Sequence, residues 1–297
     1  MALDPKPNPS RAICILGMHR SGTSVAARAL KLAGVYLGPE AAMMPPTPDN
    51  AAGYWEHLEI YRLQQRLLAQ WGRRWDMPRP LPRRWMQSRK AESFRRELRE
   101  LITKNFAGQA LWGWKEPCTC LLLPLWRDAL GSAGTKLTCL FMVRDPLEVA
   151  ASLFKRDGLA FQRGLRLWFY YNAMALRDAE GLPIIFLHYD RLLTDGEAEM
   201  RRCLAGLGLG WPQNDAHGQA LLASIQPDLR HHQSVPQGDW DMPGEVRELN
   251  AILRELSDSP EPRKDHASEV RRLTDNFLFP GSLQRLWRGW KRPRTRA

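Results

Sequence analysis

A glycine-bounded loop near the amino terminus carries residue types that bind phosphate. The loop runs from Gly17 to Gly22, follows the apolar run Ala12–Leu16 and precedes a helical pattern over Thr23–Ala33. Backbone N–H groups at a helix N-terminus point at an anion, and glycine lets the backbone approach it closely. We expect this loop to bind a phosphate through the backbone at Gly22 and the side chains of His19, Arg20, Ser21, Thr23 and Ser24.

The positive charge of this loop stands in the wrong place for an ATPase. The spacing Gly17-x4-Gly22 imitates a Walker A loop, in which the next residue is a lysine that reaches the β- and γ-phosphates. Here that residue is Thr23, and the cation stands earlier, at Arg20. A P-loop kinase also needs an acidic magnesium ligand at a strand end, for which Asp190 is the candidate, so this function is kept as an alternative.

A second candidate anion site follows a later strand. Arg144 comes directly after the buried run Lys136–Val143, and Ser152 lies eight residues further along, in a helix predicted over Pro146–Lys155. Arginine offers a phosphate a permanently charged fork, and serine adds a neutral hydrogen bond. For either residue alone a structural role is preferred, with Arg144 in a surface ion pair with Asp145 or Glu148, but the two in this context predict a phosphate site.

In this order, the two motifs resemble those of the sulfotransferases that use PAPS (3′-phosphoadenosine 5′-phosphosulfate). Arg20-Ser-Gly-Thr resembles their 5′-phosphosulfate loop, and Arg144 with Ser152 resembles their 3′-phosphate site. The resemblance covers residues 11–240 and implies PAPS as donor, no metal, and transfer of a sulfuryl group to a hydroxyl or amine. The Arg-Lys-Gly of the cytosolic branch is not found, and Arg230, which stands nearby, is the candidate for that contact.

The resemblance also implies catalytic roles. Arg20 would stabilise the charge that builds on the leaving phosphate, as a fixed cation does at a developing anion. Lys115 lies in a segment similar to one near the transferred group in glycan sulfotransferases, and Glu56 stands where a Glu beyond the phosphate-loop helix acts as base in glycan and tyrosine sulfotransferases. The alternatives for the base are His57, Glu59 and Glu116.

These residues need a parallel sheet to bring them together. Four apolar runs predict buried strands, over Ala12–Leu16, Leu111–Lys115, Lys136–Val143 and Ile184–His188. The stretches between and after these strands predict helices over Thr23–Ala33, Tyr54–Gln70, Ser88–Asn105, Pro146–Lys155, Phe161–Ala179 and Glu197–Leu207. Val35–Leu37 could form a short strand. Strands that alternate with helices predict an α/β, three-layer, P-loop-like fold with a central parallel sheet and a mostly helical C-terminal part.

Length and composition fit one globular domain with short appendages. The 297 residues are 44% hydrophobic and 25% charged, which excludes a collagen, a low-complexity chain and a wholly disordered protein. Five cysteines in so long a chain are not a disulfide scaffold, and their spacing matches no zinc site. We expect a flexible leader over residues 1–10, a single domain over 11–280 and a basic tail over 281–297.

The charge indicates an anionic partner. The net charge is +11, and eleven Lys/Arg stand against four Asp/Glu between Arg73 and Lys104. Aromatic faces stack on sugars, and four tryptophans lie in or near this stretch: Trp55, Trp71, Trp75 and Trp85. Together with the arginines, they favour a glycan or glycolipid as the acceptor. No zinc-finger or RNP motif supports nucleic-acid binding, which is kept as an alternative beside a non-catalytic PAPS-binding protein. With no signal or membrane-spanning segment, we expect a cytoplasmic protein whose tail assists association with membrane surfaces.

Overall fold

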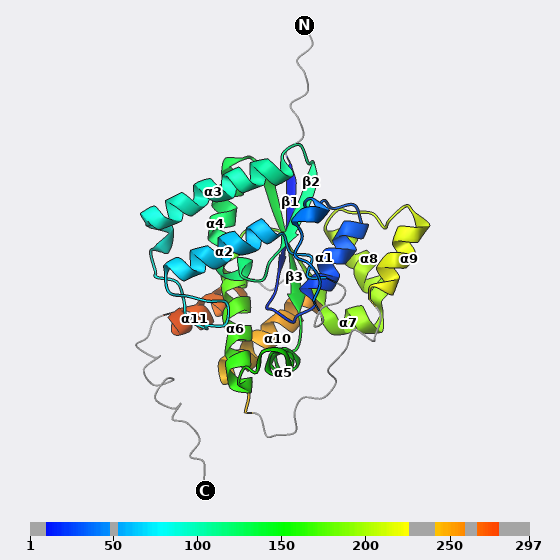
Figure 1. The fold of residues 1–297 in the computed structure, drawn as a ribbon. Coiled ribbons are helices and arrows are strands. Elements are labelled where there is room, and N and C mark those ends of the chain that lie inside the picture. The colour runs from blue at the N-terminus through cyan, green and yellow to red at the C-terminus, as the bar shows by residue number, and fades with distance from the viewer. Residues whose placement is uncertain (1–9, 48–52, 226–240, 259–265, 279–297) are drawn as a thin grey trace.

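Four parallel strands form the centre of the computed structural model, which describes residues 10–47, 53–225, 241–258 and 266–278 (Figure 1). The sheet has the order β2-β1-β3-β4 and consists of β1 (Arg11–Leu16), β2 (Leu111–Lys115), β3 (Lys136–Val143) and β4 (Ile184–His188). Cys14 of β1 is in register with Trp114 of β2 on one side and with Cys139 of β3 on the other. The predicted parallel sheet is confirmed, and β1 begins one residue earlier than expected.

Helices cover both faces of this sheet, because every central strand is apolar on both sides. Ile13 and Ile15 pack into the core beneath α1 (Thr23–Leu32), α7 (Tyr189–Thr194), α8 (Gly196–Gly206) and α9 (Asp215–Ala223). Cys14 and Leu16 belong to the larger core. The helices around this core, labelled in Figure 1, are α2 (Leu58–Gln70), α3 (Arg89–Phe106), α4 (Thr119–Ser132), α5 (Pro146–Asp157), α6 (Phe161–Asp178), α10 (Gly244–Asp258) and α11 (His266–Leu278). The result is the three-layer α/β arrangement that the sequence predicts, with a helical C-terminal part.

Each strand is followed directly by a polar residue or by the predicted phosphate loop, Gly17–Gly22, called the phosphate loop below. β1 ends at this loop, β2 at Glu116, β3 at Arg144 and β4 at Tyr189. Parallel strands all end at the same edge of a sheet, which is where α/β proteins bind their ligands. The topology therefore gathers segments that are far apart in the sequence.

The predicted helix over Tyr54–Gln70 is wrong at its start, because α2 begins at Leu58. Trp55 has a left-handed backbone with φ of 56°, and His57, the residue before α2, has an extended backbone and forms an antiparallel bridge with Met43. Glu56 thus lies in the irregular segment before α2 and not in the first turn of a helix. The possible strand over Val35–Leu37 is likewise reduced to one bridge, between Tyr36 and Trp112.

Several predicted features lie outside the described residues. These are Arg230, the leader up to residue 9 and the basic tail over 281–297. Among the helices that the structure describes, none is long and apolar enough to cross a membrane.

Candidate active site

The phosphate loop leaves the N-terminus of α1 open to a ligand. Gly22 is the N-cap residue, with a left-handed φ of 89°, and no side chain within the described part of the chain caps the helix. The first N–H groups of α1 are therefore available to an anion. The hydroxyl of Ser21 is buried and has no hydrogen-bond partner among the described residues. A buried hydroxyl of this kind is costly to leave unpaired, which fits a loop that receives a polar ligand.

Glycine is required at position 22 by its backbone and by its surroundings. A Cβ atom there would lie 2.5 Å from Cδ2 of Tyr189, and this ring is buried. The loop can approach a ligand closely because no side chain stands at this position.

We expect Gly22→Ala to destabilise the protein more than Gly34→Ala, which is a matched control. Gly34 has a similar φ of 91°, but a Cβ atom there would meet nothing within 4 Å. The left-handed backbone alone costs alanine about 1–2 kcal/mol, and the clash with Tyr189 adds about 1–3 kcal/mol at position 22. Urea unfolding of both variants measures the difference, and equal losses would contradict the clash.

The two predicted phosphate motifs touch each other. Nε of Arg20 donates a hydrogen bond to Oγ of Ser152 at 2.8 Å, and Nη1 of Arg144 donates to the carbonyl oxygen of Arg20 at 2.8 Å. Arg144 also pairs with Glu148 at 3.0 Å, and its guanidinium lies 4.0 Å from the ring centre of Tyr189. The structure therefore brings Arg20, Arg144 and Ser152 to one place, beside the open end of α1.

Lys115 and Glu56 form a buried ion pair. Nζ of Lys115 donates to Oε1 of Glu56 at 2.5 Å, and the two side chains are 2% and 7% exposed. Lys115 comes from the end of β2 and Glu56 from the irregular segment before α2. The expected base and the expected cation near the transferred group are thus brought together, in direct contact.

Glu116 is fully buried next to this pair. Neither carboxylate oxygen makes a hydrogen bond of ordinary geometry within the described chain, although the amide and thiol of Cys118 approach it. Burial first, and then the charge of Glu56, raise the pKa of Glu116 to about 8. Glu116 is therefore largely protonated at neutral pH.

His19 lies between the phosphate loop and an aromatic wall. Its ring centre is 4.8 Å from that of Trp75 and 5.8 Å from that of Tyr171. Burial first, and then the charges of Arg156, Lys115 and Arg20, hold the pKa of His19 well below its usual value. The imidazole is thus neutral, in a place surrounded by cations.

His19, Glu116 and Cys118 are the one group among the described residues with the geometry of metal ligands. Their ligand atoms lie within 4.8 Å of one another. A structural zinc site has four ligands, and this group offers three. The cations that lower the pKa of His19 also oppose a divalent ion here, so we assign no metal to this group.

The remaining predicted residues are placed as follows. The carboxylate of Glu59 is held at the surface by Lys104 and Asn105 of α3, while His57 is buried beside Phe106. Oγ of Ser24 donates to the carbonyl of Tyr54. Thr23 is buried, and its methyl group lies beside Gly17.

Two residues of the site have contacts that sequence reasoning did not foresee. Tyr189 covers Gly22 and stacks on Arg144, and its position directly after a strand was the available signal. Arg156 lies 5.7 Å from the ring centre of Trp75, one helical turn beyond Ser152. The Tyr171 hydroxyl donates a hydrogen bond to the backbone carbonyl of Trp75 and so holds this residue in place.

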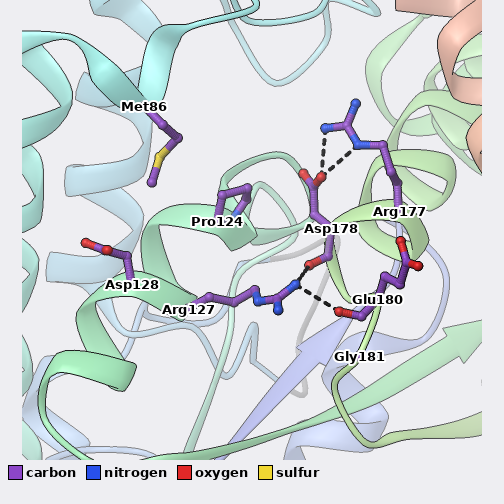
Figure 2. A pocket seen from close by; sticks show the side chains of 8 residues that line it. All are labelled: Met86, Pro124, Arg127, Asp128, Arg177, Asp178, Glu180 and Gly181. Atoms are coloured by element: carbon purple, nitrogen blue, oxygen red, sulfur yellow. Dashed lines mark hydrogen bonds and ion pairs between the residues drawn. The ribbon is translucent and has the colours of Figure 1, made fainter.

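A hollow of about 770 Å³ lies elsewhere, between Met86, the middle of α4, the end of α6 and the turn that leads into β4 (Figure 2). Nη1 of Arg127 donates there to the carbonyls of Asp178 and Glu180, and Arg177 pairs with Asp178. None of the candidate site residues lines it. Because these segments precede β4, the hollow lies at the starting edge of the strands and is separate from the candidate active site.

Comparisons with known proteins concern the family and the fold. A profile of the sulfotransferase family matches residues 12–213, which is more than half of the chain. The fold is similar to the sulfotransferase domain of the Synechococcus PCC 7002 olefin synthase, with a TM-score of 0.50 and 17% identity over 84% of this chain and 97% of that one. The sulfotransferase domain from the curacin biosynthetic pathway has a TM-score of 0.47 and 15% identity, over 83% of this chain and 98% of that one.

No curated protein sequence matches this chain. At 17% identity the olefin synthase domain shows the fold alone, so the family rests on the profile match. The matched segment begins in β1 and includes Arg20, Glu56, Lys115, Arg144 and Ser152. This chain belongs to the sulfotransferase family.

Proposed function

We propose that this protein transfers a sulfuryl group from PAPS to a hydroxyl group of an acceptor. The observation that carries the proposal is the contact between the two anion-binding motifs, through the hydrogen bond from Arg20 to Ser152 and the one from Arg144 to the Arg20 carbonyl. A donor with phosphate groups at both its 3′ and 5′ positions needs two cationic sites on one surface. A single ordinary phosphate loop offers only one.

The residues present fit such a donor. The open N-terminus of α1 and the unpaired hydroxyl of Ser21 suit the 5′-phosphosulfate, and Arg144 with Ser152 suits the 3′-phosphate. Arg230 is proposed for the same nucleotide, on the resemblance alone. When bound, the donor supplies the activated sulfuryl group, and the protein supplies binding, charge and a proton acceptor.

The reaction is proposed as an in-line displacement. The acceptor oxygen forms a bond to sulfur while the bond from sulfur to the bridging oxygen breaks, and that electron pair stays on the leaving phosphate. Arg20 and Lys115 stabilise this growing negative charge. The acceptor proton passes to a carboxylate of the protein, for which Glu56 is our first candidate.

We propose a carbohydrate or glycolipid as acceptor. Of the four tryptophans expected near the acceptor, Trp75 has a ring contact with the phosphate loop, through His19. Trp71 and Trp85 contact each other, and Trp55 lies beneath Lys31. One aromatic face beside the transferred group, with Arg156 close to it, is the support for a sugar acceptor. Sulfation of simple sugars in preference to phenols would support this choice, and the reverse order would contradict it.

The domain limits also remain a proposal. Val246, Leu249 and Val270 share the larger core with α6, which supports a single domain over residues 11–280. Cytoplasmic location and membrane association through the tail are proposed from the sequence alone.

The donor is tested by thermal unfolding with 3′-phosphoadenosine 5′-phosphate (PAP) in the absence of magnesium, against ATP with magnesium. A ligand at about 100 times its dissociation constant adds about 2.7 kcal/mol to stability, which raises the melting temperature visibly. We expect stabilisation by PAP, loss of this effect in Arg144→Ala, and no loss in Arg66→Ala, an exposed arginine paired with Glu97 between α2 and α3. Stabilisation by ATP with magnesium alone would favour a P-loop kinase.

A further inference from the structure

The buried end of β2 holds two carboxyl groups and one ammonium group. Lys115 contacts Glu56 at 2.5 Å, and Glu116 follows Lys115 directly in the sequence. All three residues are buried, and Glu56 acts electrostatically on Glu116. One cation here serves two carboxyl groups.

This arrangement is expensive for a purely structural core. A buried carboxyl group without a well-formed hydrogen bond destabilises the folded protein, and an apolar side chain of similar size would not. Charged and polar groups that are kept at such a cost are often functional, especially in a cleft near other catalytic groups. Glu116 is such a group: it is fully buried and lies beside His19, close to the candidate site residues.

The titratable and charged groups around Glu116 come from several elements of the fold. Lys115 and Glu56 are its charged neighbours, and His19 is neutral. Five further titratable groups interact electrostatically with Glu116: Cys14, Tyr61, Cys118, Cys120 and Tyr171. They keep their protons because burial raises their pKa values. Lys115 is therefore the neighbour that controls the charge balance of the two carboxyl groups.

We propose that Glu56 and Glu116 form one proton-accepting pair, which Lys115 keeps inactive until the donor is bound. This inference rests on the proposed function. Without donor, the ammonium group of Lys115 neutralises Glu56, and Glu116 carries a proton. When the sulfuryl group arrives, its negative oxygens draw Lys115 away from Glu56. The two carboxyl groups then hold one proton and one uncompensated negative charge between them.

A buried pair in this state takes up a proton readily, because the second proton removes its charge. In the transfer step the acceptor O–H bond breaks, its oxygen bonds to sulfur, and its proton joins the pair. The bond between sulfur and the bridging oxygen breaks, and its electron pair stays on the leaving phosphate, so no further reactant is needed. When Lys115 returns to Glu56, the pair releases this proton to solvent.

The device links activation of the base to the presence of the donor. In the donor-free protein the ion pair with Lys115 occupies the carboxylate of Glu56. It becomes available only while Lys115 contacts the group to be transferred. This predicts that the acceptor is activated after the donor has bound.

Titration calorimetry of PAPS binding without acceptor tests the pair directly. The experiment is run at pH 8 in two buffers of different ionisation enthalpy, which reveals the number of protons bound. We expect the wild type to take up a fraction of a proton per PAPS, and much less per PAP, which has no sulfuryl group to draw Lys115. Equal uptake with both nucleotides would overturn the role of Lys115.

Three variants identify the groups. Glu56→Gln and Glu116→Gln are expected to bind PAPS without proton uptake, because each lacks one carboxyl group of the pair. Lys115→Met is also expected to show no uptake, because without the ammonium group the two carboxyl groups already hold both protons before PAPS binds. Glu97→Gln, a surface control on α3 paired with Arg66, should behave as wild type. Uptake that persists in Glu116→Gln overturns the pair. PAPS binding without any uptake in the wild type overturns the pair alone, whereas no binding at all overturns the proposed function as well.

Discussion

Replacement of Arg20 by methionine is expected to lower kcat for sulfuryl transfer by about 10²–10³-fold, the usual loss when one donor to a developing anion is removed. Arg20 stands in the loop that opens α1, and its guanidinium is aimed across the site at Ser152. No other cation of the phosphate loop can replace it, because His19 is held neutral by burial and nearby charge. Arginine does not deprotonate in proteins, so its effect must be electrostatic.

The measurement is release of PAP from PAPS, with a sugar acceptor and with water alone. Arg20→Lys keeps the charge but loses the fork that reaches Ser152, so its loss should be smaller than that of Arg20→Met. Ser152→Ala removes a neutral partner and should cost less than the loss of the charge. The fold should survive, because the Arg20 carbonyl, which Arg144 binds, is present in every variant. If Arg20→Met has the kcat of the wild type, Arg20 does not stabilise the transition state.

The sheet could be predicted because its strands are buried on both faces. Runs such as Cys139–Val143 are apolar at every position, and such runs are typical of parallel sheets covered by helices. For the same reason the sequence did not predict α4. Its residues Cys120–Leu123 are also all buried and show no helical period, and the helix contains Pro124. Uniform burial thus identifies a core segment without identifying its secondary structure.

The site was predictable where one local motif carries it, and not where tertiary contacts carry it. Arg20 follows a strand and precedes a helix, so its role is visible within a short stretch. Glu56 and Lys115 lie 59 positions apart and meet because β2 pairs with β1 while a bridge between Met43 and His57 holds the segment before α2. The register of a neighbouring strand decides that contact, and no local pattern contains it.

The replacement of Glu116 by glutamine is expected to stabilise the protein in alkaline solution. The pKa of Glu116 is raised from 4.5 to about 8 in the folded protein. The folded state therefore binds more protons than the unfolded state between these values, so this residue lowers stability progressively as the pH rises from about 4.5 to about 8. Above that range the cost is complete and, at 1.36 kcal/mol per pKa unit, reaches at most about 5 kcal/mol.

Glutamine has nearly the same shape and carries no charge, so Glu116→Gln should remove this pH dependence. Urea unfolding at pH 5 and pH 9 measures it: the variant should gain several kcal/mol over wild type at pH 9 and little at pH 5, whereas Glu97→Gln should change neither. If the gain is the same at both pH values, Glu116 is not the group that titrates. A variant that is more stable and yet transfers sulfuryl groups more slowly would mean that the carboxyl group is kept for its chemistry, because stability alone favours its loss.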